Sequence, residues 1–174
     1  MGGLLFSPNG RIGRNRFWQG MVVLTVASVL VAAGAVMVGT LFGLLSYALI
    51  YPYICVYGKR LHDAGLTAWW VIGVWVGTLI FNFIFSLILT PFFMGEEELA
   101  IQEEMTDRMM SGDLSGMMEG AEILAAQLLP LTIFLTVATN LAAAIVVGFL
   151  PTDPNENKHG PVPGGAADTG NTFE

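Results

Sequence analysis

Four charged or titratable side chains stand together at residues 59–63, inside the stretch YGKRLHDAGLTAWW (57–70). Lys59, Arg60, His62 and Asp63 are residue types that can move protons, bind an anion or bind a metal ion. In a catalytic interpretation, Asp63 would orient His62 as a general base. Side chains of adjacent residues rarely adopt that relation, and no Ser or Cys nucleophile adjoins them. We therefore predict no catalytic residue and a protein that is not an enzyme.

Metal binding has little more support from the sequence. The chain has two histidines, His62 and His159, and their spacing with Asp63 fits no usual ligand pattern. The segment 94–122 holds six of the nine methionines, whose thioether sulfur suits Cu(I), but it has no histidine and no MxM or MxxM repeat. Methionine also suits packing and adaptable contacts. We predict no metal and no cofactor.

The elements that must position these residues are membrane spans. The chain is 54% hydrophobic and 12% charged, against about 25% charged in an average globular domain. Three ranges lack Asp, Glu, Lys and Arg: 17–58, 64–95 and 123–152. As one helix the first would measure about 63 Å, twice a ~30 Å hydrocarbon core, so we predict two spans with a turn near 34–43. The fold class is all-α with four transmembrane helices.

Basic residues orient these spans. Six of the seven Lys/Arg lie in three short segments, around Arg11, Lys59 and Lys158, and four crossings place all three on one side. The positive-inside rule makes that side cytoplasmic, so both termini are predicted inside. The predicted segments are a basic N-terminal segment (1–16), a transmembrane hairpin (17–58), a charged turn (59–67), a third span (68–93), an acidic Met-rich outer loop (94–122), a fourth span (123–150) and a flexible tail (151–174).

Local patterns refine three of these segments. In the outer loop, Ile101, Met105 and Met109 recur every four residues and predict a short amphipathic helix over 97–110, which SGDLSG (111–116) ends. In the charged turn, basic residues lie at the C-terminal end of the second span, where the helix dipole favours positive charge. Thr67 is a candidate N-cap for the third span. Trp69 and Trp70 are predicted to lie at the depth of the lipid headgroups, where Trp is enriched in membrane proteins.

Three blocks of the chain resemble a known family. They are GRIGRNRFW (10–18), KRLHDAGLTAWW (59–70) and NKHGPVP (157–163), and they resemble the signature blocks of the bacterial inner-membrane family called domain of unknown function 805. This chain departs from the family pattern at Lys59, usually Arg, at His159, usually an aromatic residue, and at Val162, usually an acid. The resemblance implies a bacterial inner-membrane protein and implies no activity.

All three blocks fall on the predicted cytoplasmic side, which suggests one composite surface. Such a surface would bind anionic lipid headgroups, at about 1 kcal/mol per basic residue, or an acidic segment of a partner. The predicted lipid or partner contacts are Arg11, Arg14, Trp18, Lys59, Arg60, His62, Asp63, Trp69, Trp70 and Asn157.

Small and polar residues inside the spans predict helix packing. The pairs in GTLFG (39–43) and GVWVG (73–77) allow close approach of helices, within the chain or with a neighbour. Uncharged polar side chains at 82, 127 and 140 are costly in lipid, and hydrogen bonding between helices is favoured over lining a transport route. The predicted packing residues are Gly39, Gly43, Gly73, Gly77, Asn82 and Asn140.

Taken together, these patterns favour a non-catalytic accessory or scaffold subunit of the bacterial inner membrane. Its expected partners are membrane lipids and other integral membrane proteins or further copies of itself, with no nucleic acid. One alternative is a small oligomeric channel or transporter, although no ionisable residue lies deep in a predicted span. A second alternative is a membrane enzyme of lipid or envelope metabolism.

Overall fold

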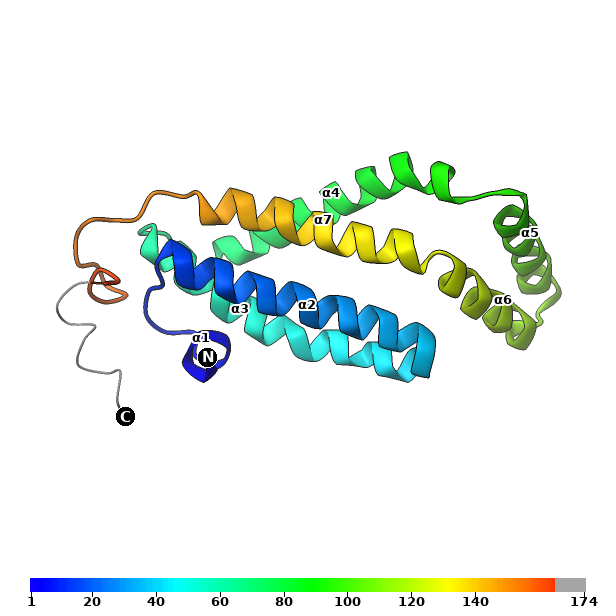
Figure 1. Ribbon diagram of the computed structural model, residues 1–174, viewed down its shortest axis with the longest axis horizontal. Coiled ribbons are helices and arrows are strands. Elements are labelled where there is room, and N and C mark those ends of the chain that lie inside the picture. Colours follow the sequence, from blue (N-terminus) through cyan, green and yellow to red (C-terminus); the bar gives the residue numbers. More distant parts are fainter. Residues whose placement is uncertain (165–174) are drawn as a thin grey trace.

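The computed structural model describes residues 1–164, and every regular element in that range is a helix (Figure 1). Four are long and apolar enough to cross a membrane: α2 (Arg14–Val38), α3 (Leu45–Asp63, preceded by the 3-10 turn Thr40–Leu44), α4 (Trp70–Phe93) and α7 (Leu129–Gly148). This confirms the predicted fold class and the four spans. Which side of the membrane each end faces stays a prediction.

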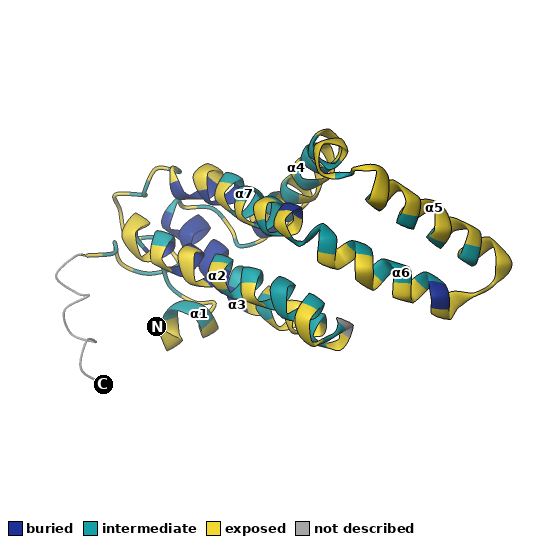
Figure 2. Cartoon of the chain, turned by 45° about the vertical axis from the view of Figure 1, so that its right-hand side comes forward, coloured by how far each residue is buried: buried dark blue, intermediate teal, exposed yellow. Residues whose placement is uncertain are grey.

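The four long helices form an open bundle. Helix α2 packs along α3 and α7, and α7 also packs on α4, which crosses α7 at an angle and diverges from it (Figure 1). The outward faces are apolar and exposed (Figure 2), and α4 buries only Val71. Contiguous apolar surface of this extent is rare on soluble monomers. The bundle surface therefore suits lipid or membrane-protein neighbours.

The turn between α2 and α3 falls at Gly39, inside the predicted range. Its φ of +124° lies in the region that favours glycine, because a Cβ there would strain the backbone. Gly34 is also required, since the Phe42 ring occupies the place where its Cβ would stand. The absence of two side chains thus lets the chain reverse at the membrane surface.

The turn between α3 and α4 begins later than the predicted 59–67. Helix α3 continues to Asp63, and the turn occupies 64–69. The prediction for Thr67 was wrong: no side chain caps α4, and the Thr67 carbonyl accepts a hydrogen bond from the Trp70 N–H (3.2 Å). The charged residues stay helical because other segments of the chain bind their side chains, as described below.

The predicted outer loop is a helical hairpin. Helix α5 (Glu96–Ser111) matches the amphipathic helix expected over 97–110, whereas α6 (Leu114–Gln127) was not predicted. The fourth span accordingly begins at Leu129 rather than at 123. Within the hairpin, a Cβ on Gly120 would lie 2.6 Å from Met105 Cγ, so the two helices approach closely at this glycine.

Both ends of the described chain lie at the same end of the bundle (Figure 1). We call it the basic end; α2 and α4 begin there, and α3 and α7 end there. The short helix α1 (Gly2–Phe6), which was not predicted, packs on α3. Hydrogen bonds hold the segment 152–160 there, whereas the sequence predicted a flexible tail from 151 onward. Residues 165–174 of that tail lie outside the described range.

Candidate functional site

Asp63, the last residue of α3, is the centre of the basic end. Its side chain is fully buried, and each carboxylate oxygen accepts hydrogen bonds from other segments of the chain. Oδ1 accepts from Arg11 Nε (3.3 Å) and Nη2 (3.2 Å). Oδ2 accepts from Arg60 Nη1 and from Thr152 Oγ1 (2.9 Å). One carboxylate therefore joins the N-terminal segment, α3 and the segment after α7.

Arg60 binds the end of α7. Its side chain is fully buried, and Nη2 donates to the carbonyl oxygens of Gly148 (3.1 Å) and Leu150. The last carbonyls of a helix lack partners within the helix and carry partial negative charge, so a guanidinium stabilises them. Arg60 thus ties the last turn of α3 to the last turn of α7.

Arg11 extends the same network to the C-terminal segment. Besides Asp63, it donates to the carbonyl oxygens of Asp153 (Nη2, 2.6 Å) and Asn155 (Nη1, 2.8 Å). The Asp153 N–H in turn donates to the Asp63 carbonyl oxygen (2.8 Å). We call Arg11, Arg60, Asp63, Thr152 and Asn157 the signature cluster.

Asn157 and two histidines complete the contact. Asn157 Nδ2 donates to the His62 carbonyl oxygen (3.1 Å) and to Asp153 Oδ2 (3.2 Å). Hydrogen bonds from Asn155 and Asn157 hold the pKa of the Asp153 carboxyl below its ordinary value. The His62 ring stacks on the His159 ring, with centroids 3.7 Å apart and planes 5° from parallel. Position 159 is therefore a stacking position, where the aromatic residue usual in the family would also fit.

Lys59 binds the N-terminal helix. Its side chain lies beneath α1, and Nζ donates to the carbonyl oxygens of Gly3 and Leu4 (2.6 Å each). The residue is 3% exposed. A lysine at this position thus fixes α1 against α3, a contact the sequence analysis did not foresee.

The predicted contact residues divide into two groups. The first group points into the chain, and its members bind one another or backbone carbonyls: Arg11, Lys59, Arg60, His62, Asp63 and Asn157. This corrects the expectation of one open basic surface, because buried guanidinium and carboxylate groups satisfy each other here. The exposed members are Arg14, Trp69 and Trp70, whereas Trp18 is half-buried against Gly148 and Phe149. Lipid or partner contact stays a prediction for the exposed group.

Chemically, the signature cluster holds segments together. Its donors and acceptors are engaged within the chain, except Arg60 Nε, which is buried without a partner. Within residues 1–164, no three His, Cys, Asp or Glu side chains are grouped so as to hold a metal ion. The arrangement fixes the relative positions of α2, α3, α7 and the C-terminal segment.

Polar side chains inside the spans connect helices. Asn82 Nδ2 on α4 donates to Thr139 Oγ1 on α7 (3.1 Å). Asn140 Oδ1 on α7 accepts from the Tyr53 hydroxyl on α3 (3.0 Å), which also lies 3.0 Å from Ser28 Oγ on α2. These are interhelical hydrogen bonds of the kind predicted for both asparagines.

The glycines that permit close packing within the chain differ from those predicted. Gly77 has no atom within 4 Å of its Cβ position, and the nearest atom to that of Gly73 belongs to Trp70. Gly39 serves the turn, and Gly43 meets only the Ala35 Cβ, at 3.4 Å. At Gly148 a Cβ would lie 3.0 Å from Phe17 Cε1. Packing of Gly73 and Gly77 against a neighbouring molecule stays a prediction.

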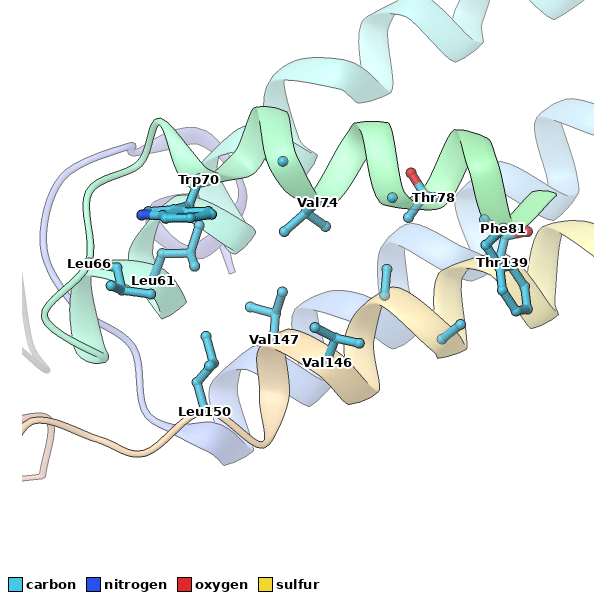
Figure 3. A pocket seen from close by; sticks show the side chains of 14 residues that line it. Leu61, Leu66, Trp70, Val74, Thr78, Phe81, Thr139, Val146, Val147 and Leu150 are labelled. Atoms are coloured by element: carbon cyan, nitrogen blue, oxygen red, sulfur yellow. The ribbon is translucent and has the colours of Figure 1, made fainter. Parts of the chain in front are cut away.

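Gly77 instead faces a groove between α4 and α7 (Figure 3). The groove has a volume of about 580 Å³ and widens toward the basic end. Its lining is almost entirely apolar, with Trp70 and Val74 on α4, Val146 and Val147 on α7, and Leu150 after α7.

We expect docking of residues 157–160 to weaken in acid. Burial lowers the pKa of His159 below its ordinary value of 6.5, and the nearby charges of His62, Lys158 and Arg11 act in the same direction. The undocked ring therefore takes up a proton first, so the stabilisation is complete above about pH 6.5 and is lost as the pH falls below it.

Amide hydrogen exchange at His159 and Gly160, corrected for its intrinsic pH dependence, measures this docking. Exchange should increase on acidification in the wild type, and His159→Phe should keep the stack while reducing that increase. An unchanged pH profile in His159→Phe would assign the sensitivity to another group, His62 being the nearest.

Two residues of these hydrogen-bond networks, Thr152 and Tyr53, could not be identified from the sequence. Thr152 binds Asp63 and Arg60, yet it lies in a Pro- and Asp-rich segment that reads as a loop. Tyr53 links three helices, yet in the sequence it is one aromatic residue of an apolar span. The order of residues alone could not pair them with distant partners.

Comparison with known proteins gives one match. A family model described as "Protein of unknown function (DUF805)" matches residues 5–161, a range that contains all of the signature cluster. No curated protein and no solved structure matches the chain.

Proposed function

This chain belongs to the DUF805 family, and from that premise we propose that it is a non-catalytic accessory or scaffold subunit of the bacterial inner membrane. In this proposal both termini are cytoplasmic and the α5–α6 hairpin lies outside. The polar side chains that mark the family at Arg11, Arg60 and Asp63 are used to hold three chain segments together. That use of the signature residues is the observation that carries the proposal.

The surfaces left for a partner are of two kinds. Helix α4 presents a stripe of apolar side chains, Leu79, Phe83 and Leu87, which are 71%, 65% and 61% exposed. These residues are four apart and so lie on one face of the helix. The α5–α6 hairpin offers an acidic surface with exposed methionines, among them Met110. A rigid basic end would hold both surfaces in a constant orientation.

The test is gentle solubilisation of native membranes, native separation and mass spectrometry of the components that comigrate with this chain. We expect stoichiometric comigration with a larger complex. A triple alanine variant of the α4 stripe should lose comigration if a partner helix binds there, and a matched variant on α2 (Val22→Ala, Val26→Ala, Leu30→Ala) should retain it. Migration of the wild type alone, or only with its own copies, would contradict the accessory role.

Three single variants separate the alternatives. A transporter should lose flux in liposomes when Asn140→Ala breaks the hydrogen bond with Tyr53. An enzyme should lose turnover with His62→Ala while remaining folded. An accessory subunit should keep its partner with Asn82→Gln.

A further inference from the structure

We propose that the groove between α4 and α7 holds one acyl chain of an anionic phospholipid from the leaflet at the basic end, with the exposed Arg14 binding its headgroup. This deepens the proposed function, on which it rests, by naming one lipid class against which the chain packs. Four features of the groove carry the proposal: its length, its closed end, its lining and its mouth.

The length of the groove matches one leaflet. Its lining runs from Trp70 to Phe81 on α4, and from Thr139 on α7 to Leu150, which follows the end of that helix. The α4 stretch rises about 17 Å at 1.5 Å per residue, close to half of a ~30 Å hydrocarbon core.

The groove is closed near the middle of the membrane. Beyond Phe81, α4 and α7 are joined by the hydrogen bond between Asn82 and Thr139 (3.1 Å) and by the rings of Phe85 and Phe134, whose centroids are 6.1 Å apart. Figure 3 shows the two helices converging toward Phe81 and Thr139. A spanning helix of a second copy would extend past this closed end, whereas an acyl chain ends within its own leaflet.

The lining favours an apolar occupant. Its two hydroxyl groups are already engaged, because Thr78 Oγ1 donates to the Trp75 carbonyl oxygen (2.8 Å) and Thr139 Oγ1 accepts from Asn82. The space exists because Gly77 has no side chain and nothing else lies within 4 Å of its Cβ position. A volume of about 580 Å³ falls in the range of small-molecule sites.

The mouth carries positive charge. Leu150 lines the groove, and its carbonyl oxygen accepts from Arg14 Nη2 (3.4 Å), which places this exposed guanidinium near the open end. The first turn of α2 has no acidic residue that would neutralise Arg14. The indole nitrogen of Trp70 faces the same end (Figure 3). Anionic headgroups complement this charge better than zwitterionic ones.

The test measures lipid retained by the purified chain. The protein is reconstituted with equal amounts of dioleoyl phosphatidylglycerol and dioleoyl phosphatidylcholine, extracted gently and weighed by native mass spectrometry. We expect one retained lipid, mainly phosphatidylglycerol. Gly77→Phe should fill the groove and lower retention about tenfold, equivalent to about 1.4 kcal/mol. The matched control Leu79→Phe, on the same helix but outside the lining, should retain lipid as the wild type does.

Two further variants keep the result interpretable. Val146→Phe fills the same groove from α7, at a residue that is 68% exposed, in case Gly77→Phe fails to fold. Arg14→Gln should keep chain binding and lower the preference for phosphatidylglycerol about fivefold, equivalent to about 1 kcal/mol. Wild-type retention in both groove variants would overturn the lipid site. A dimeric wild type with monomeric groove variants would also overturn it, because a second copy would then occupy the groove. An unchanged preference in Arg14→Gln would overturn the headgroup assignment.

Failure of this proposal would leave the accessory role testable, because comigration with a larger complex is measured on native membranes. If the groove variants lose lipid but still comigrate with the larger complex, the lipid site is supported and the partner binds another surface. Comigration without any retained lipid in the wild type overturns the lipid site alone.

Discussion

Asp63→Ala should lower the free energy of unfolding by about 3–5 kcal/mol, the usual result of removing one partner of a buried ion pair. The variant leaves the Arg60 guanidinium fully buried without its carboxylate, and it removes the acceptor that Arg11 and Thr152 share. The loss should be visible as a lower midpoint of thermal unfolding in mild-detergent micelles, followed by circular dichroism.

A double-mutant cycle separates this coupling from simple loss of packing. Arg60→Met and Asp63→Leu should each destabilise the chain, and the double variant should cost less than their sum by about 0.5–3 kcal/mol. The matched control is Arg108→Ala, which removes an exposed pair with Glu104 (2.6 Å) on α5 and should cost less than about 1 kcal/mol. Additive losses in the cycle, or equal losses in Asp63→Ala and Arg108→Ala, would contradict a structural role for the signature cluster.

The convergence of the three signature blocks followed from charge distribution, whereas their burial did not. Basic residues at the predicted membrane surface can either face lipid headgroups or pair with carboxylates of the same chain. The sequence alone does not decide between the two. Arg11 and Asp63 are 52 positions apart, and Thr152 lies 89 positions beyond Asp63. Only the packing of α2, α3 and α7 brings them within hydrogen-bonding distance. Arg11 and Asp63 were therefore predictable as site residues but their burial was not, and Thr152 was not predictable at all.

The outer segment shows a second limit. The absence of charge from 123 onward predicted the start of a span, but residues 123–127 belong to α6 and pack toward α5. Gln127 Nε2 donates to Glu97 Oε1 (2.9 Å), which fixes the end of α6 to the start of α5. A charge-free stretch indicates a span but does not define where the helix begins. The α5 helix itself was predictable because its apolar period is regular.

Glycine spacing was the least informative pattern. The pairs at 39–43 and 73–77 have the spacing of helix-packing motifs, yet Gly77 faces open space and Gly39 makes a turn. Two glycines that do lie in close contact between spans, Gly20 against Val56 and Gly148 against Phe17, belong to no pair with that spacing. Spacing identifies a face of a helix, and only the fold decides which faces meet.

Gly148→Leu is therefore expected to have an effect opposite to that of Gly77→Leu. A Cβ at Gly148 would lie 3.0 Å from Phe17 Cε1 and 3.1 Å from Trp18 Cζ2, and Phe17 is fully buried with little room to move. Overpacking of this kind costs about 1–3 kcal/mol. We expect the upper end of that range, because displacement of α7 also strains the hydrogen bond from Arg60 to the Gly148 carbonyl oxygen (3.1 Å).

Gly77→Leu meets no atom within 4 Å of the new Cβ and replaces a poor helix former by a good one, a gain of up to about 1 kcal/mol. Thermal unfolding of the two variants in the same micelles should thus move in opposite directions from the wild type. An unchanged stability in Gly148→Leu would mean that the helix packing around Gly148 is looser than its contacts indicate. A loss in Gly77→Leu as large as that in Gly148→Leu would mean that the space at Gly77 does not accept a side chain. Opposite shifts would show that packing of Phe17 and Trp18, in the first signature block, requires a glycine at the end of α7. The end of α7 would then be as important for this packing as Asp63, at the end of α3, is for the signature cluster.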